Sequence, residues 1–327
     1  MIRPGTDADG PAYIRLIGEA WGEFPGVVFD VDAELPELHH LASWFAAGGG
    51  TLWLAEDAGR PLGMVATRPL GSDSAWEICR MYVDRAARGS GLAQRLLDTA
   101  EAHARAAGAQ RMVLWTDTRF NAAHRFYEKQ SYVRQGAVRI LDDLSKSLEF
   151  RYAKPLTGLV VDMLDAAAAS SAERRLADIL VACVAEGGSL LWHRPLAFEP
   201  ARAVCRQLAA DVAAQHRLLL AAWQEGALAG WMRISLAVAQ TRPHCARLGP
   251  WLVHPAWRGQ GVGRALLARG EQAALGLGRR LLSLETAAGG RGERLLLAAG
   301  WAEAGRIPGQ ALGEAGERLD AVTYLRG

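Results

Sequence analysis

Two glycines at the start of an expected helix, Gly89 and Gly91, have the residue type and spacing of an anion-binding loop. Glycine leaves backbone N–H groups uncovered by side chains, and the dipole of a helix favours negative charge at its N-terminus. The chemistry predicted here is the binding of a phosphate or pyrophosphate group. The alternative is that the glycines only allow a tight turn between a strand and a helix.

A second copy of this arrangement lies about 170 residues downstream, around Gly259 and Gly261. In both copies a strand-like apolar run leads into the loop, an arginine (Arg88 or Arg258) opens the loop, and a leucine pair follows on an amphipathic helix. A repeated loop with the same flanking elements favours anion binding over a simple turn. It also predicts that the chain contains two versions of one domain.

Two common phosphate loops do not fit this pattern. A P-loop closes with a lysine and a hydroxyl residue, and neither copy has them. A dinucleotide-binding fingerprint needs a third glycine, where this chain has Gln94 and Arg264. The pattern that remains is an arginine, two residues, a glycine, one residue, and then a glycine or alanine.

This pattern resembles the acetyl-CoA pyrophosphate loop of the GNAT (Gcn5-related) N-acetyltransferases. The resemblance extends over nearly the whole chain, through the tract 115–127 in the first half and the Gly300-Trp301 pair in the second. It implies acetyl-CoA as co-substrate, no metal, and a strand before each loop that splays from its neighbour to admit the pantetheine arm. The cofactor-binding residues that it implies are Met81, Tyr82, Val83, Arg88, Gly89, Ser90, Gly91, Leu92, Ala93, Gln94 and Asn121 in the first half, and Leu252, Val253, Arg258, Gly259, Gln260, Gly261, Val262, Gly263 and Arg264 in the second.

Length and composition agree with two domains, expected at residues 1–155 and 156–327. The chain has 327 residues, half of them hydrophobic, which is enough for two packed cores. Its 37 basic and 35 acidic residues leave no broad positive surface, so nucleic acid is not an expected partner. The scattered cysteines have no zinc spacing, and no apolar run is long enough for a membrane span. We expect a cytoplasmic protein; whether it forms a homodimer stays open.

Hydrophobic patterning predicts strands that alternate with helices in each half, and hence an α/β (α+β) fold of two tandem GNAT domains, each with a mixed sheet flanked by helices. In the first half, after an opening strand and a helix, we expect helices at 34–47, 92–107 and 121–130 and strands at 51–55, 62–67, 76–83, 112–115, 133–140 and 148–152. In the second half we expect a helix capped at 170–173 that runs to 186, a helix at 201–214, and strands at 159–161, 218–223, 228–236, 248–253, 281–284 and 320–325.

Two residues in the first half could carry proton transfer during amine acetylation. An alkylamine is mostly protonated at pH 7, so a base is needed, and Glu77 lies on the strand that leads into the loop, where several GNAT enzymes have a glutamate base. Tyr127 stands where the family has a tyrosine that protonates the departing thiolate. The alternatives are that Glu77 lies on a solvated strand face and that Tyr127 only packs beside Phe126. His124, one helical face away, is expected to make a local hydrogen bond or to contact substrate.

The second half lacks both groups, because Arg247 aligns with Glu77 and Leu296 with Tyr127. We therefore expect catalysis in the N-terminal domain and a degenerate, structural or regulatory C-terminal domain. The alternative is that residues such as His244, Glu285 or Tyr324 substitute there.

The function predicted for the chain is acetyl transfer from acetyl-CoA to a primary amine of a small molecule or peptide by direct attack. An acetyl-CoA-binding regulatory or scaffold protein is the alternative, and such a protein would need neither Glu77 nor Tyr127. The acceptor site is expected to form from residues 21–29, the strand around Trp76, and residues 139–143.

Overall fold

The computed structural model describes residues 1–71, 74–187, 191–236, 239–312 and 316–327. Contacts divide the chain into two compact units. The N-terminal unit comprises Met1–Tyr127 and Arg134–Thr157, and the C-terminal unit comprises Glu128–Val133 and Gly158–Gly327. Each unit contains a mixed sheet flanked by helices, so the predicted α/β fold with two tandem halves is confirmed.

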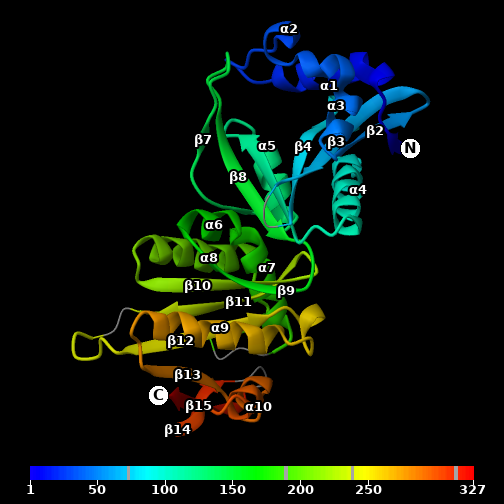
Figure 1. The fold of residues 1–327 in the computed structure, drawn as a ribbon. Coiled ribbons are helices and arrows are strands. Elements are labelled where there is room, and N and C mark those ends of the chain that lie inside the picture. The colour runs from blue at the N-terminus through cyan, green and yellow to red at the C-terminus, as the bar shows by residue number, and fades with distance from the viewer. Residues whose placement is uncertain (72–73, 188–190, 237–238, 313–315) are drawn as a thin grey trace. The chain divides into compact units, whose positions relative to one another are not determined.

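The sheet of the N-terminal unit has the strand order β1-β2-β3-β4-β5-β8-β6, and β7 pairs with β8 (Figure 1). Neighbouring strands are antiparallel from β1 to β4, parallel between β4 and β5, and antiparallel between β5 and β8. The elements are β1 (Ile2–Pro4), α1 (Gly10–Trp21), α2 (Val31–Glu34), α3 (Leu41–Ala47), β2 (Thr51–Asp57), β3 (Arg60–Pro69), β4 (Ala75–Val83), α4 (Leu92–Ala106), β5 (Arg111–Asp117), α5 (Asn121–Lys129), β6 (Val133–Arg134), β7 (Arg139–Ile140) and β8 (Leu148–Pro155).

Helices cover both faces of this sheet. Leu96, Leu97 and Ala100 recur at helical spacing and are buried on the inner face of α4, and Gly108 follows the helix with the positive φ (+84°) typical of a helix end. On the other face, Tyr13 and Leu16 of α1 pack in one cluster with residues of α3, β2 and β3. The sheet is therefore held between α4 on one side and α1 with α3 on the other.

Two expected elements of this unit are interrupted. The expected helix at 34–47 is split into the end of α2, a 3₁₀ turn at Pro36–His40 and α3. Pro36 disfavours helical geometry at the residue before it, and Leu35 leaves the α region with φ −134° and ψ 41°. The expected strand at 133–140 forms only the short β6 and β7, because Gly136 between them has φ +73°.

The sheet of the C-terminal unit has the order β14-β15-β13-β12-β11-β10-β9. Figure 1 shows α6, α7 and α8 on one face and α9 on the other. The elements are β9 (Leu159–Leu164), α6 (Ala166–Ser171), α7 (Glu173–Ala185), α8 (Phe198–Ala213), β10 (Arg217–Gln224), β11 (Ala227–Ser235), β12 (Cys245–Val253), α9 (Val262–Gly276), β13 (Leu281–Ala287), α10 (Arg291–Ala298), β14 (Ala302–Leu312) and β15 (Arg318–Arg326).

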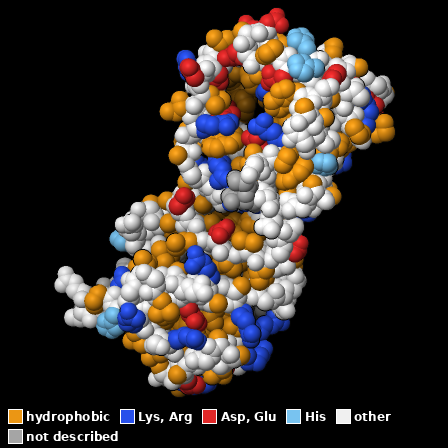
Figure 2. All heavy atoms as spheres, in the orientation of Figure 1, with side chains coloured by type: hydrophobic (Ala, Val, Ile, Leu, Met, Phe, Trp, Pro, Cys, Tyr) orange, Lys and Arg blue, Asp and Glu red, His pale blue; other side chains and the backbone are white. Residues whose placement is uncertain are grey.

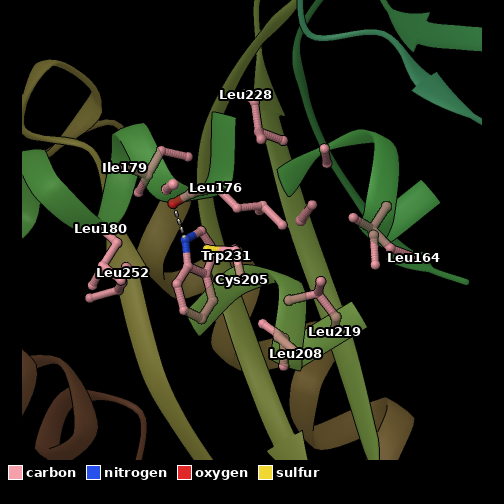
Figure 3. Packing of buried hydrophobic residues seen from close by; sticks show 14 of the residues in the cluster. Leu164, Leu176, Ile179, Leu180, Cys205, Leu208, Leu219, Leu228, Trp231 and Leu252 are labelled. Carbon is pink, nitrogen blue, oxygen red and sulfur yellow. Dashed lines mark hydrogen bonds between the residues drawn. The ribbon is translucent and has the colours of Figure 1, made fainter. Parts of the chain in front are cut away.

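The core under α7 and α8 is built around Trp231 of β11. Its indole is fully buried, and Nε1 donates to the carbonyl oxygen of Leu176 at 3.1 Å (Figure 3). Leu180, Cys205 and Leu219 belong to the same cluster. A buried indole is stabilised when its N–H finds an acceptor, so this hydrogen bond fixes α7 against the sheet.

Sequence patterning missed a short helix and a strand of this unit. The helix expected from residues 170–173 to 186 is α7, although Ala172 at its N-cap makes no side-chain hydrogen bond. The missed helix is the short α6 before it, where the Asp165 side chain accepts a hydrogen bond from the Ala168 amide at 2.8 Å. The missed strand is β14, whose side chains are mostly exposed and which contains Gly305 and Pro308. It therefore lacks the apolar alternation that identifies a half-buried strand.

The short segment Glu128–Val133 follows Tyr127 directly and belongs to the C-terminal unit. The Ser131 hydroxyl accepts a hydrogen bond from the Leu228 amide (3.1 Å), and the Ser131 carbonyl accepts one from Trp223 Nε1 (3.0 Å). Val133 lies in the same core cluster as Trp223 and Leu228. The end of α5 is thus built into the second unit.

Candidate active site

The strand that leads into the first glycine loop parts from its neighbour in the middle of the sheet. β4 pairs with β5 only from Ala75 to Ile78; beyond that point β4 continues along β3 and β5 continues along β8. A register shift between Met64 and Ala66 accompanies the change, and Arg80 on β4 adopts a left-handed conformation with φ +47°. The edge of β4 from residue 79 to 83 therefore has no β5 partner, as the predicted splayed pair requires.

The first glycine loop follows β4 through a short 3₁₀ turn, Arg85–Ala87. Gly89 and Gly91 have φ +80° and +79°, which a residue with a side chain adopts only at a cost. The first amide of α4 to bond back along the chain is that of Arg95, which donates to Gly91 O. The amides between Gly91 and Arg95 lie in the first helical turn, where an α-helix makes no internal hydrogen bonds.

Side chains around this loop hold it in place. Asp84 accepts a hydrogen bond from the Ala86 amide (2.9 Å) and pairs with Arg15 and Arg60, and these contacts keep the pKa of its carboxyl below the usual range. Arg88, the motif arginine, donates to Val83 O and pairs with Glu23 at 2.8 Å. These two contacts hold the Arg88 side chain against the loop.

The loop has open space for an anionic ligand. A Cβ added at Gly89 would meet no atom within 4 Å, so the surface above this backbone is unfilled. The glycine positions and the first turn of α4 together offer uncovered amides at a positive helix end. The residues present therefore fit the diphosphate of acetyl-CoA.

Tyr127 lies on α5, which Figure 1 places between β8 and β4. Its phenol is 7% exposed and donates to the sulfur of Met81 on β4 at 3.5 Å. Burial raises the pKa of the phenol, and the nearby Tyr82 and Cys79 raise it further. The hydroxyl is therefore protonated at neutral pH, and it stands beside the strand edge that β5 leaves free.

Glu77 is on the opposite face of β4 from Trp76 and Ile78, and it is 7% exposed, so it is not on a solvated face. Arg68 on β3 donates to its carboxylate from Nε (2.8 Å) and from Nη2 (2.7 Å). Glu77 precedes Met81 by four residues, which is about 13 Å along a strand. Sequence reasoning missed Arg68, although the antiparallel register that places it opposite Glu77 follows from the hairpin.

The two other residues of α5 singled out in the sequence have different settings. Asn121 is the first residue of the helix and is exposed. His124 is buried, its Nε2 lies 2.9 Å from Asp117 O, and its ring packs against Phe150 and Tyr152. His124 thus makes local contacts within the fold, the first of the two roles expected for it.

The expected acceptor segments meet above the splayed strands. Ser145, in the turn between β7 and β8, exchanges hydrogen bonds with the backbone of Val28 (2.8 and 3.3 Å). Nearby, the Arg139 guanidinium lies 4.3 Å from the centre of the Trp115 ring and donates to Glu149. Figure 2 shows a hollow in this unit, with apolar side chains within it and both acidic and basic side chains around it. Val28, in the expected segment 21–29, is thus bonded to Ser145, two residues beyond the expected segment 139–143.

The second glycine loop repeats the backbone of the first. Gly259 and Gly261 have φ +77° and +86°, and Arg258 donates to Val253 O and pairs with Glu186. β12 and β13 likewise pair only from Cys245 to Leu248 before they part.

The side chains beside this second loop differ from those of the first. Trp251 takes the place of Met81, and its ring would lie 3.2 Å from a Cβ at Gly263. Leu296, in the place of Tyr127, is fully buried, and Tyr324 donates its hydroxyl to Glu293 at 2.8 Å. This unit keeps the loop without the phenol or the carboxylate of the first.

A family model described as "Acetyltransferase (GNAT) family" matches the chain twice, at residues 15–132 and 189–298. The chain belongs to the GNAT acetyltransferase family. The two matches confirm the tandem arrangement, and membership makes the protein an N-acetyltransferase that uses acetyl-CoA.

Among curated relatives of this GNAT protein, the uncharacterized N-acetyltransferase YjgM of Escherichia coli (strain K12) is 33% identical over 132 residues, which cover 39% of this chain and 78% of YjgM. Two solved structures align with about half of the chain. The putative acetyltransferase yncA from Salmonella typhimurium, solved with its cofactor acetyl-CoA, is 18% identical with a TM-score of 0.42, over 52% of this chain and 93% of its own. The ribosomal-protein-alanine N-acetyltransferase from Brucella melitensis is 20% identical with a TM-score of 0.42, over 48% and 99%. Among the helices that the structure describes, none combines the length and apolar character needed to span a bilayer.

Proposed function

We propose that the N-terminal unit of this GNAT protein transfers the acetyl group of acetyl-CoA to a primary amine by direct attack. The observation that carries the proposal is the position of Tyr127, whose buried phenol contacts Met81 where β4 leaves β5 and near the glycine loop. A protonated phenol beside the strand edge suits protonation of a leaving thiolate.

The glycine loop and the unpaired part of β4 would hold acetyl-CoA, which supplies an acetyl group activated as a thioester. The amides around Gly89, Gly91 and the first turn of α4 would bind the diphosphate. Met81, Tyr82 and Val83 would line the arm on the free edge of β4, and Asn121 lies at the exposed start of α5.

Two residues would move the protons as the new C–N bond forms and the C–S bond breaks. Tyr127 would donate its phenol proton to the departing sulfur. Glu77 would accept, through water, the proton that the amine nitrogen loses, because the carboxylate lies too far along β4 for direct contact. Arg68 would keep that buried carboxylate oriented between turnovers.

Residues 21–29 and 139–147 would together form a wall that faces the acceptor. Tyr82 is held there by a hydrogen bond from Trp21 Nε1 to its hydroxyl at 2.9 Å, and Arg139 covers Trp115. Aromatic rings beside paired charges suit a small molecule or peptide that carries the amine on a partly apolar body.

We also propose that the C-terminal unit does not catalyse acetyl transfer. Arg247 and Leu296 cannot act as the base and the acid at the places of Glu77 and Tyr127, and the Trp251 indole fills space beside the loop. Tyr324, the remaining phenol near this site, is already committed to Glu293.

Thiol release measured with a panel of primary amines tests the assignment. We expect Tyr127→Phe to lower kcat about 10²- to 10⁴-fold with little change in KM for acetyl-CoA. The matched control is Tyr324→Phe in the C-terminal unit, which should leave turnover unchanged. Undiminished turnover in Tyr127→Phe would overturn the proposal, and a loss confined to Tyr324→Phe would move catalysis to the other unit.

A further inference from the structure

Three arginines lie together on one face of the C-terminal sheet: Arg217 on β10, Arg233 on β11 and Arg247 on β12, here called the arginine cluster. Ser235 of β11 pairs with Arg217 on one side and with Arg247 on the other, so these residues form one row across three strands. Arg233 lies two residues before Ser235 on the same strand. The cluster is therefore defined by strand register.

The arginine cluster points to the α7 and α8 side of the sheet. Met232 and Ile234, the neighbours of Arg233 on β11, belong to the core under α9. Since side chains alternate along a strand, Arg233 points the other way, to the face that also carries Trp231 (Figure 3). Arg247 alternates in the same manner with Leu248, which belongs to the α9 core.

No carboxylate makes a direct ion pair with Arg233 among the residues that the structure describes, and Asp211, which acts on it from a distance, is already paired with Arg217. Its Nε donates to the carbonyl oxygen of Gly249 at 2.9 Å. Arg217 pairs with Asp211 at 2.7 Å, and Arg247 lies 3.7 Å from Glu285. Burial together with repulsion from Arg217 and Arg247 lowers the pKa of Arg233 to about 10. A partly buried cation in this position is stabilised by an anion.

The N-terminal unit carries the opposite arrangement at the same place. Gly63 pairs with Val83 there, and Gly230 pairs with Val253 here, so the two hairpins can be compared residue by residue. In the N-terminal unit this position holds the Arg68–Glu77 ion pair. In the C-terminal unit the residue matching Arg68 is neutral Ser235, Arg247 replaces the carboxylate, and Arg233 adds a further positive charge. The N-terminal unit thus has a carboxylate at this place, which suits a cationic amine, whereas the C-terminal unit has arginines, which suit an anion.

We propose that the arginine cluster is a binding site for a small oxyanion, a carboxylate or a phosphate group, held by Arg233 and Arg247 with the Ser235 hydroxyl. Planar guanidinium groups bind both kinds of oxyanion through paired N–H donors. The site is separate from the glycine loops. It gives the C-terminal unit a ligand-binding role that needs neither catalytic residue and that does not depend on the activity of the N-terminal unit.

Calorimetric titration of the full chain with inorganic phosphate and with succinate, at ionic strength matched by sodium chloride, tests this proposal. We expect saturable binding of at least one of the two, and the preferred probe distinguishes a phosphate site from a carboxylate site. Arg233→Met should weaken that binding about tenfold or more. Arg291→Met, at an exposed arginine at the start of α10, is the matched control and should leave binding unchanged.

One further variant keeps the test decisive. Arg247→Met should reproduce the loss, and it replaces Arg233→Met if the latter fails to fold. Absence of binding by both probes, or binding that is as tight in both arginine variants as in the wild type, would overturn the assignment.

Discussion

Replacement of Gly89 by alanine isolates the proposed diphosphate contact from the stability of the fold. Gly89 has φ +80°, a conformation that costs a residue with a side chain about 1 kcal/mol. An added Cβ meets no atom within 4 Å, so no clash increases that cost. We expect the free energy of unfolding to fall by about 1 kcal/mol and Tm by about 2–4 °C.

The same methyl group would cover amides that we propose bind the diphosphate. A hydrogen bond to a charged group contributes about 1.5–3 kcal/mol, so the loss of one should raise KM for acetyl-CoA about 10- to 100-fold. The proton-transfer residues Glu77 and Tyr127 are untouched, and kcat at saturating acetyl-CoA should therefore stay near the wild-type value. Initial rates of thiol release over a range of acetyl-CoA concentrations give both constants.

Gly259→Ala is the matched variant in the other unit. Gly259 has φ +77° and also has no atom within 4 Å of its would-be Cβ, so the stability cost should be the same. Under our assignment its KM for acetyl-CoA equals that of the wild type. An unchanged KM in Gly89→Ala would refute the loop's role, and equal rises in KM in both variants would refute catalysis by the N-terminal unit alone.

Three further predictions concern buried charges. Lys154→Met should lower the free energy of unfolding by about 3 kcal/mol, because it breaks the buried 2.8 Å ion pair with Glu101. Adding Glu101→Leu to this variant should restore most of the lost stability in chemical denaturation. A Lys154→Met variant as stable as the wild type would contradict this prediction. Glu77→Gln should lower kcat about 10²-fold at pH 7. The loss should shrink towards pH 10, where the amine substrate deprotonates without a base. A loss of kcat that does not change with pH would argue against Glu77 as the base. Burial lowers the pKa of His124, so below about pH 6.5 the unfolded chain binds a proton that the folded chain does not, and the free energy of unfolding declines as the pH falls. The urea midpoint should therefore fall between pH 7.5 and pH 5.5 by less in His124→Gln than in the wild type. Equal declines in the two proteins would contradict this prediction.

The glycine loops were predictable because they depend on local backbone requirements. Gly89 and Gly91 adopt positive φ as their residue type suggests, and the loop leads into α4 with the expected buried stripe. The split of the helix at 34–47 was also within reach, since Pro36 was visible in the sequence. The strand β14 could not be predicted, because its exposed, glycine-containing segment lacks the residue pattern of a strand.

The sequence identified the candidate site residues, but it did not predict the contacts that their side chains make. Position in the motif identified Tyr127, yet its contact with Met81 depends on how α5 packs against β4. Glu77 could be found by its offset from the loop, whereas its burial and its pairing with Arg68 depend on the register of β3. Likewise, the proposed role of Arg233 becomes visible only when three strands are aligned, because the other two arginines of the cluster lie on the neighbouring strands β10 and β12.

The anchoring of Ser131 by Trp223 and Leu228 bears on why the two halves of the chain stay together. Ser131 lies four residues beyond Tyr127, and it holds a left-handed backbone (φ +67°) while its hydroxyl and carbonyl accept hydrogen bonds. Deletion of everything after residue 157 would strip these donors from the end of the helix that carries the phenol. A gene shortened to its first half would therefore encode a chain without this anchor at the end of α5. Under the proposed function, selection for the first copy would then conserve the second.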